Sequence, residues 1–266
     1  MIRISCIIPA YNEGARIGHV LAAAVGHPNL AEIIVVDDGS TDETRAEILK
    51  FPQAKLIALS PNGGKAHAVA EGIRASTGTH ILMIDADLVG LTKDDLSALL
   101  APVLSGDADY ALSLRHDALL PFRLIGLDYI SGERVFARSF IEPHLTELES
   151  LSGYGLESCM NELVLAAQLR VAVVVWHHVG HTYKVRKVGL VRGIFGEIRM
   201  IMNIIETVSL VGTAHQIIAL LRIRKLYPVT TPANSKTSQL HGPTNTSVPF
   251  VGMRLAKKRD TQAPLS

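Results

Sequence analysis

The sequence predicts an α/β fold in which helices flank a mostly parallel central sheet. The first observation is that short apolar runs alternate with amphipathic helical patterns through about the first 115 residues. The second is size, because 266 residues, 48% of them hydrophobic, can form one large domain with a substantial core. The two cysteines, Cys6 and Cys159, are too few for a disulfide framework and favour a reducing compartment. Disordered, collagenous and disulfide-stapled classes are therefore excluded.

The expected strands of the first part of the chain span residues 2–8, 32–36, 55–59, 80–84 and 110–114. Pro9 is expected to end the first strand, because proline has no N–H for the ladder. Helices are expected near residues 17–25, 65–73 and 92–100, where apolar side chains recur at helical spacing. After residue 115 the pattern loosens, and it predicts helices near 129–140 and 157–169 and a strand over 171–176.

Polar and glycine-rich segments follow the first four strands, at the edge where an open parallel sheet binds ligands. The segments are Pro9-Ala10-Tyr11-Asn12-Glu13-Gly14, Asp37-Asp38-Gly39-Ser40-Thr41-Asp42, Ser60-Pro61-Asn62-Gly63-Gly64-Lys65 and Asp85-Ala86-Asp87. Together they present carboxylates, an aromatic ring, a glycine turn and a lysine to one rim. The sequence therefore predicts an active site for a charged ligand.

Asp85 and Asp87 stand two residues apart at a strand end, so both side chains are expected on one side, where they could share a divalent cation. Such a cation would neutralise the phosphates of a nucleotide diphosphate. The pair could instead belong to a solvated turn, where aspartate is common. The apolar run before it favours the cation, because two unpaired carboxylates would be costly beside a buried strand.

Lys65 opens a helix after a Gly-Gly pair, where backbone N–H groups and the helix dipole favour an anion. It is expected to contact phosphates, or otherwise to be a surface lysine. Asp37 and Asp38 could accept hydrogen bonds from a base or a ribose; alternatively, Asp38 only shapes the following turn. Tyr11 could stack on a base or simply cover the strand end.

With the strand residues that precede them, these four segments closely resemble the family 2 glycosyltransferases of the GT-A fold. The resemblance covers about the first 115 residues and implies a nucleotide-diphosphate sugar donor, with UDP and GDP both open. It implies that Asp87, with Asp85, binds Mg or Mn as cofactor. The donor-binding residues that it implies are Pro9, Tyr11, Glu13, Asp38, Lys65 and Asp85.

Two later segments, Ser131-Gly132-Glu133-Arg134-Val135-Phe136 and Gly153-Tyr154-Gly155-Leu156-Glu157, look like acceptor-side segments of polyprenyl-phosphate hexosyltransferases and glucosyl-3-phosphoglycerate synthases. By this resemblance Arg134 faces an acceptor phosphate or carboxylate; otherwise it lies on a helix surface. Glu157 is expected to be a general base, or to orient Arg134 or the metal shell. His181 is expected to complete the metal shell, or otherwise to be a surface histidine.

The expected activity is that of a hexosyltransferase of the EC 2.4 class that moves one sugar, with catalytic residues Asp87, Glu157 and Arg134. The expected acceptor bears a phosphate, such as a polyprenyl phosphate or phosphoglycerate. Family 2 implies inversion at C1, whereas the phosphoglycerate type implies retention. A Gln-x-x-Arg-Trp motif is absent, which favours single addition over polymerisation. The alternatives are a nucleotidyltransferase, whose Gly-rich basic loop is missing after the first strand, and a non-catalytic nucleotide-binding scaffold at the membrane surface.

A single GT-A domain is expected over 1–228, comprising a nucleotide-sugar-binding half (1–115), an acceptor half (116–183) and a C-terminal helical segment (184–228). Residues 184–199 are basic and 200–221 largely apolar, so this segment is expected to pack on the domain, form a homodimer or lie at a membrane surface. Polar residues inside it disfavour a membrane span. Residues 229–266 are expected to be a disordered tail. The expected location is cytoplasmic, including the inner face of the membrane, and a net charge of +1 disfavours nucleic acid as a partner.

Overall fold

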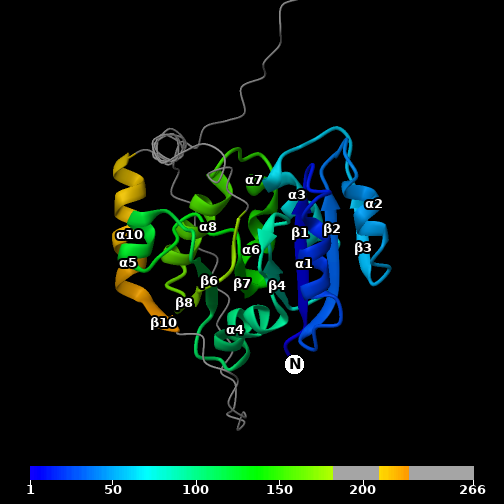
Figure 1. Ribbon diagram of the computed structural model, residues 1–266. Coiled ribbons are helices and arrows are strands. Elements are labelled where there is room, and N and C mark those ends of the chain that lie inside the picture. The colour runs from blue at the N-terminus through cyan, green and yellow to red at the C-terminus, as the bar shows by residue number, and fades with distance from the viewer. Residues whose placement is uncertain (182–209, 228–266) are drawn as a thin grey trace, which may run out of the picture.

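The computed structural model describes residues 1–181 and 210–227 (Figure 1). Within these ranges one sheet has the strand order β10-β8-β6-β7-β4-β1-β2-β3. Its strands are β1 (Ile4–Ala10), β2 (Leu30–Asp37), β3 (Ala54–Ala58), β4 (His80–Met83), β6 (Tyr110–Arg115), β7 (Arg134–Ala137), β8 (Val171–Trp176) and β10 (Arg224–Tyr227). A second, two-stranded sheet pairs β5 (Leu88–Val89) with β9 (Gly180–His181).

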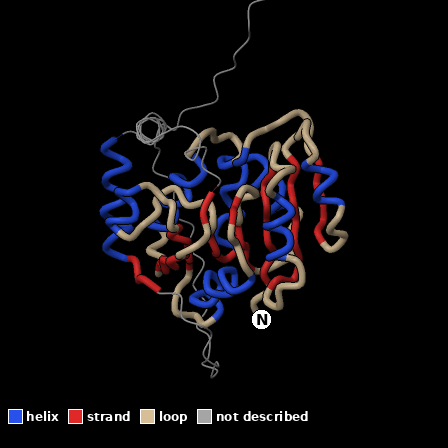
Figure 2. The backbone as a smooth tube through the Cα atoms, in the orientation of Figure 1, coloured by secondary structure: helices blue, strands red, loops and turns tan. Residues whose placement is uncertain are grey.

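Helices cover both faces of the central sheet (Figure 2). They are α1 (Ile17–Ala24), α2 (Thr44–Leu49), α3 (Lys65–Arg74), α4 (Lys93–Leu104), α5 (Leu120–Ile125), α6 (Arg138–Ile141), the 3-10 turn η1 (Glu142–His144), α7 (Leu145–Leu148), α8 (Gly155–Ala166) and α10 (Leu210–Ile223). Every strand pair of the central sheet is parallel except those made by β7. The α/β class with a mostly parallel sheet is thus confirmed.

The central strands are buried on both faces, which explains why they are continuous apolar runs in the sequence. In β1, Cys6 and Ile8 belong to a core that includes residues of α1 and α4, whereas Ile7 belongs to a core that includes residues of α3 and α8. Alternate side chains of one strand therefore join two different apolar layers. The burial fixes the register in which β1 presents its carboxyl end to the site.

The first strand continues through Pro9 to Ala10, so the expected stop at Pro9 is wrong. Ile7 O accepts a hydrogen bond from Ile84 N, and the backbone of Pro9, two residues later, faces the same side of β1. The pairing of β4 with β1 ends at Ile7. Pro9 therefore lies beyond the neighbouring strand, where a missing N–H costs no ladder bond.

The helix expected near 129–140 is also wrong, because residues 134–137 form β7 and only the short α6 follows. β7 lies between β4 and β6 and is antiparallel to both. Its Val135 and Phe136 point into opposite cores. Pairing on two edges outweighs the local helical pattern, since strand formation depends strongly on the neighbours that a segment meets.

The C-terminal segment is described only from Leu210 onward. α10 packs against α8, and β10 extends the sheet as a parallel neighbour of β8. The basic stretch 184–199 and the tail 229–266 lie outside the described residues. In the described part of the chain, no helix combines the length and apolar character that crossing a membrane requires.

Candidate functional site

A cavity of about 220 Å³ lies at the carboxyl edge of the central sheet. Its wall is formed by the start of α3, the loop after β4, the loop after β6, the start of α8 and β9. The charged side chains that line it come from segments more than 100 residues apart: Lys65, Asp85, Asp87, Arg115, Asp117, Asp128, Glu157 and His181. The structure thus brings two of the four predicted strand-end segments, those of Lys65 and of Asp85 with Asp87, together with residues from the later half of the chain.

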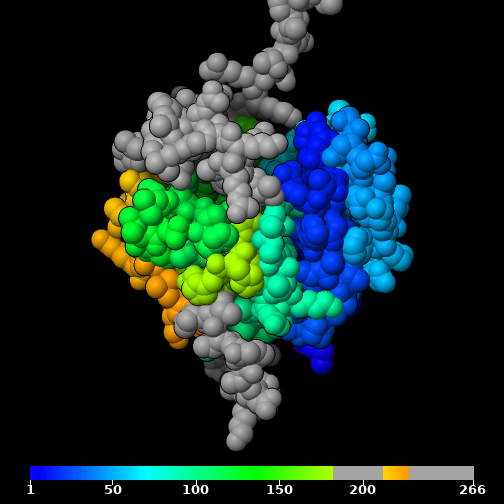
Figure 3. All heavy atoms as spheres, viewed as in Figure 1, coloured from blue at the N-terminus to red at the C-terminus, as the bar shows by residue number. Residues whose placement is uncertain are grey.

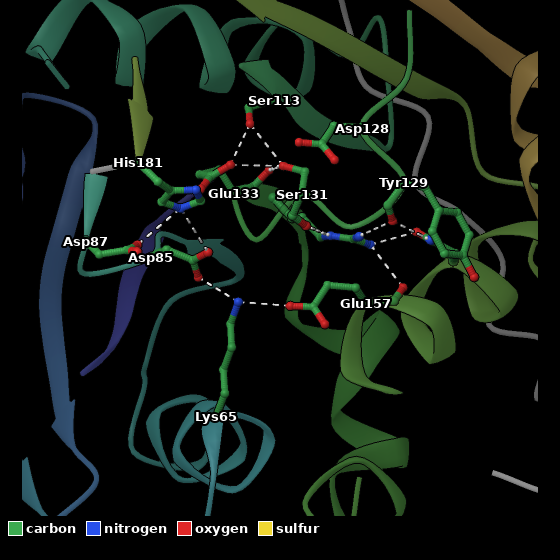
Figure 4. Close-up of polar contacts among 12 residues, drawn as sticks. Lys65, Asp85, Asp87, Ser113, Asp128, Tyr129, Ser131, Glu133, Glu157 and His181 are labelled. Carbon is green, nitrogen blue, oxygen red and sulfur yellow. Dashed lines mark hydrogen bonds and ion pairs between the residues drawn. The ribbon is translucent and has the colours of Figure 1, made fainter. Parts of the chain in front are cut away.

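Asp85, Asp87 and His181 converge in this cavity (Figure 4). His181 Nε2 lies 3.1 Å from Asp87 Oδ1 and 3.9 Å from Asp85 Oδ2. The pairing of β5 with β9 causes this meeting, because β5 follows Asp87 directly and its Leu88 is opposite His181. Two carboxylates and one imidazole are a donor set that fits Mn²⁺ well and Mg²⁺ acceptably. Each of the two carboxylates thus lies within 4 Å of the imidazole, whereas the three residues here whose ligand atoms all lie within 4.8 Å of one another are Asp85, Glu133 and His181. Binding of one ion by Asp85, Asp87 and His181 together stays a prediction.

Glu133 lies beside this set, and its carboxylate is near enough to Asp85 and His181 to be considered as a metal ligand. Both of its oxygens are already engaged, however. Arg115 Nη1 donates to Oε1 and Oε2 at 2.8 and 3.0 Å, and Ser113 Oγ donates to Oε2 at 2.6 Å. We therefore assign Glu133 to holding Arg115.

Lys65 occupies the first turn of α3, directly after Gly64, whose φ of +94° suits glycine. Its Nζ lies 2.7 Å from Asp85 Oδ1 and 2.9 Å from Glu157 Oε1. Burial alone would lower the pKa of Lys65, but the charges of Asp85 and Glu157 outweigh it and raise that pKa. Burial likewise opposes ionisation of Asp85, yet Lys65 and His181 hold its pKa below the ordinary value. Lys65 therefore stays cationic and Asp85 anionic at neutral pH.

The pKa of His181 is raised. Burial and the charge of Arg115 favour the neutral ring, but the hydrogen bond to Asp87 and the charges of Asp87 and Asp85 outweigh them. A metal ligand must be unprotonated, so a bound cation and a proton compete for this imidazole.

Glu157 lies in the first turn of α8 and is 2% exposed. Its Oε1 accepts from Lys65, whereas its Oε2 has no hydrogen-bond partner among the described residues. The structure thus places Glu157 at the cavity, with one carboxylate oxygen that is buried and has no hydrogen-bond partner among the described residues. Its expected role as a base stays a prediction.

The expectation that Arg134 faces an acceptor is wrong, since its side chain is fully buried and does not line the cavity. Its guanidinium donates to Ser131 O at 2.6 Å, to Asn161 Oδ1 at 2.8 Å, and to Tyr110 Oη and Tyr129 O at 2.9 and 3.2 Å. The position of β7 between two strands turns this side chain into the interior. Arg134 therefore links β7 to α8 and to the loop 129–131.

Asp38 is buried directly after the end of β2. Its carboxylate holds a turn more distant in the chain than the one that the alternative interpretation names, because Oδ1 and Oδ2 accept from Gly63 N and Gly64 N at 2.8 and 2.7 Å. Its contact with a nucleoside stays a prediction. Asp37 is held by Arg45 at 2.9 Å and by Ser40 N, so it has a structural role. Asp38 thereby positions the start of α3.

Pro9, Tyr11 and Glu13 lie at or just after the end of β1. The ring of Tyr11 is half-exposed, and Glu13 pairs with Arg16. Burial raises the pKa of Glu13, Arg16 opposes this, and the charge of Asp87 adds to the rise. Glu13 is therefore near enough to Asp87, a predicted metal ligand, to be affected by its charge. Nucleoside binding by these residues stays a prediction.

Arg115, Asp117 and Asp128 line the cavity although they were not predicted as site residues. Arg115 Nη2 donates to Asp128 Oδ2 at 3.1 Å. Burial raises the pKa of Asp128 to about 6; Arg115 opposes the rise and Glu133 adds to it. Arg115 and Asp117 follow the expected strand 110–114, so the strand-end rule applied to the fifth strand could have found them. Asp128 follows no strand and gave no such signal.

Comparisons with known proteins bear on the family and on the fold of this chain. A family model described as Glycosyl transferase family 2 matches residues 5–148. Curated relatives include 4,4'-diaponeurosporenoate glycosyltransferases of Staphylococcus aureus, which are 34% and 35% identical over 102 residues, or 36% of this chain. The matched part covers 27% of the length of those relatives.

Solved structures of glucosyl-3-phosphoglycerate synthase from Mycobacterium tuberculosis have a similar fold, with a TM-score of 0.59 and 22% identity. The similarity covers 77% of this chain and 79% of that one. One of those structures contains phosphoglyceric acid, and another contains Mn²⁺, UDP and glucosyl-3-phosphoglycerate.

Proposed function

Because this chain belongs to glycosyl transferase family 2, we propose that it transfers one hexose from a nucleoside-diphosphate sugar to an acceptor. The observation that carries the proposal is the meeting of Lys65 with Asp85, Asp87 and His181 in one cavity. A fixed cation next to a set of metal ligands is what the departure of a diphosphate requires.

We propose that Asp85, Asp87 and His181 hold Mn²⁺ or Mg²⁺. A bound divalent cation would offset the negative charge that develops on the diphosphate. The excess of negative charge in the cavity suggests that donor binding depends on a metal ion. Five carboxylates line it against two strong bases, so an unaccompanied diphosphate would be repelled. Lys65 supplies a further positive charge. Asp85 and Glu157 raise the pKa of its ammonium group and so keep it protonated.

The nucleoside site is proposed at the ends of β1 and β2, where Pro9, Tyr11, Glu13 and Asp38 lie. The exposed ring of Tyr11 offers a stacking surface for a base. Uridine is the first base to test, because the synthase of similar fold was solved with Mn²⁺ and UDP-glucose. Guanine nucleotides are the comparison.

The proposed acceptor is a phosphate-bearing molecule, for which phosphoglyceric acid in the synthase of similar fold is the supporting observation. Arg134 lies in the interior, so Lys65 and Arg115 are the strong bases of the described cavity that could meet such an anion. Glu157, with one unpartnered oxygen, is the proposed base for an acceptor that must lose a proton. The anomeric configuration of the product would show whether the reaction inverts or retains.

The test is thermal stabilisation of the purified chain by UDP, GDP and their glucose and mannose conjugates, with and without Mn²⁺. A ligand that binds the folded state raises the melting temperature with concentration. We expect stabilisation by one nucleotide only when metal is present, and we expect Asp87→Ala to abolish it.

The matched control is Asp107→Ala, which removes an exposed aspartate just before β6, whereas the opposite end of that strand reaches the cavity. It should respond to nucleotide and metal as the wild type does. Product formation with 3-phosphoglycerate or a polyprenyl phosphate then tests the transfer itself. If no nucleotide stabilises the wild type, or if Asp87→Ala is stabilised equally, the proposed donor site is wrong.

A further inference from the structure

One face of the molecule, formed by α5, α10 and β10, is both apolar and exposed. Five of the large apolar side chains that are exposed among the described residues lie on it: Leu120 and Leu124 of α5, Ile218 and Ile223 of α10, and Leu226 of β10. Leu124 alone is 78% exposed. The other such side chains are distributed over several other elements. We call this surface the α5–α10 face.

The segments that make the α5–α10 face are far apart in sequence but adjoin in space. Arg224 Nη2 donates to Ile125 O at 2.7 Å, which ties the start of β10 to the end of α5. Gly126, just after α5, lies next to the side chain of Leu226. The inner side chains Ile125 and Ile217 pack against the same core. Figure 3 shows α5 in green beside the yellow and orange of α10 and β10. The exposed apolar side chains therefore lie on neighbouring elements.

The charged residues that the structure describes on α5, α10 and β10 are all cationic. Arg123, Arg222 and Lys225 are exposed there. Residues 118–127 and 210–227 include no aspartate or glutamate. Exposed aliphatic side chains with interspersed cations are complementary to a bilayer surface, where aliphatic groups enter the headgroup region and cations meet lipid phosphates. An acidic protein surface would match the cations alone, whereas an anionic bilayer surface matches the cations and the exposed aliphatic side chains together.

We propose that the α5–α10 face docks on an anionic membrane surface. Leu120 and Leu124 enter the headgroup layer, and Arg123, Arg222 and Lys225 contact lipid phosphates. The inference goes beyond the proposed transfer reaction and holds or fails without it. It also has a consequence for that reaction. α5 begins directly after Ala118 and Leu119, which line the cavity, so docking would keep the cavity close to lipid-borne molecules.

The test is co-sedimentation of the full chain with vesicles of phosphatidylglycerol and phosphatidylcholine, compared with vesicles of phosphatidylcholine alone. The wild type should bind the anionic vesicles, and the binding should weaken as salt is raised, because salt screens exposed charges. Leu124→Asp should lower the partition coefficient at least tenfold. Arg222→Gln should lower it about fivefold, as expected for one cation at an anionic surface.

The matched control is Leu49→Asp, which places the same charge at an exposed leucine of α2. It should bind vesicles as the wild type does. Unchanged metal-dependent nucleotide stabilisation of Leu124→Asp would show that this variant is folded and that its donor site is intact. The two proposals can therefore fail separately.

Three results would overturn the inference. The first is that the wild type does not bind anionic vesicles. The second is that Leu124→Asp binds them undiminished, which would place the lipid contact elsewhere in the chain. The third is that Leu124→Asp abolishes a concentration-dependent dimer in light scattering while vesicle binding is unchanged, which would make this face an interface between two copies.

Discussion

At the scale of single residues, the site depends on which arginine the backbone turns toward the cavity. Arg115 ends β6 and lines the cavity, whereas Arg134 starts β7 and is fully buried. Both are strand residues with carboxylates nearby in sequence, so their local patterns are similar. The two side chains are the same, so the position of each arginine within the sheet decides whether it reaches the cavity or the interior.

Gly132 lies against the carboxylate of Asp85, and a Cβ at this position would overlap with it. We expect Gly132→Ala to displace Asp85 and to weaken metal-dependent nucleotide binding at least tenfold, measured by titration calorimetry. Gly18→Ala is the control, because its nearest new contact, Glu47 Oε2, would be 3.8 Å away. Equal affinities of Gly132→Ala and the wild type would show that the geometry of Asp85 does not limit binding.

Asp128 should make stability depend on pH. Its pKa is about 6 in the folded chain, above the ordinary aspartate value of about 3.9, so folding favours its protonated form. Its contribution is fully present below about pH 4 and is lost as the pH rises through 6. We expect urea denaturation to show a loss of about 3 kcal/mol from this group, and Asp128→Asn to lack it. Identical pH profiles for the two proteins would contradict this assignment.

At the scale of elements, the site is assembled by three antiparallel strand pairings within a fold that is otherwise parallel. The β5–β9 pair places His181 beside Asp87, and β7 between β4 and β6 places the segment 131–133 beside Asp85. α8 is then fixed by Arg134, which reaches Asn161 and the carbonyl of Glu157. The first turn of α8 thereby presents Glu157 to Lys65.

Arg134→Lys should loosen this attachment, because an ammonium cannot reproduce the planar fork that donates to five groups. We expect the free energy of unfolding to fall by about 2–4 kcal/mol. Hydrogen exchange at the start of α8 should also become faster. Arg138→Lys, four residues later and less buried, should cost less than about 1 kcal/mol. Equal costs for the two variants would mean that the burial of Arg134 is not what matters.

At the scale of the whole molecule, α10 and β10 are packed on the rest of the described fold, although residues 182–209 before them lie outside the described part of the chain. α10 packs on α8, and Tyr129 Oη donates to Gln216 Oε1 at 2.6 Å. Leu220 of α10 is 1% exposed and belongs to the core that includes residues of α3 and α8. The helix that carries part of the α5–α10 face is thus also an integral part of the fold.

Leu220→Ala should therefore lower the free energy of unfolding by about 2–5 kcal/mol, as for a large-to-small change in a core. Ile218→Ala, on the exposed side of the same helix, should change it by less than about 0.5 kcal/mol. Chemical denaturation should show a single transition in both variants. A second, earlier transition for Leu220→Ala would mean that α10 unfolds independently of the remaining domain.

The sequence by itself determined the parallel core and the polar rim at its carboxyl edge. Continuous apolar runs specify doubly buried strands, and the polar segments after them share one edge by the geometry of a parallel sheet. Tertiary structure alone decided that His181 meets Asp87, that Arg115 rather than Arg134 reaches the cavity, and that α5 lies beside β10. Each of these depends on pairing between segments that are distant in the chain. Local patterns carry little information about such pairing, because its free energy comes from neighbours that only the fold supplies.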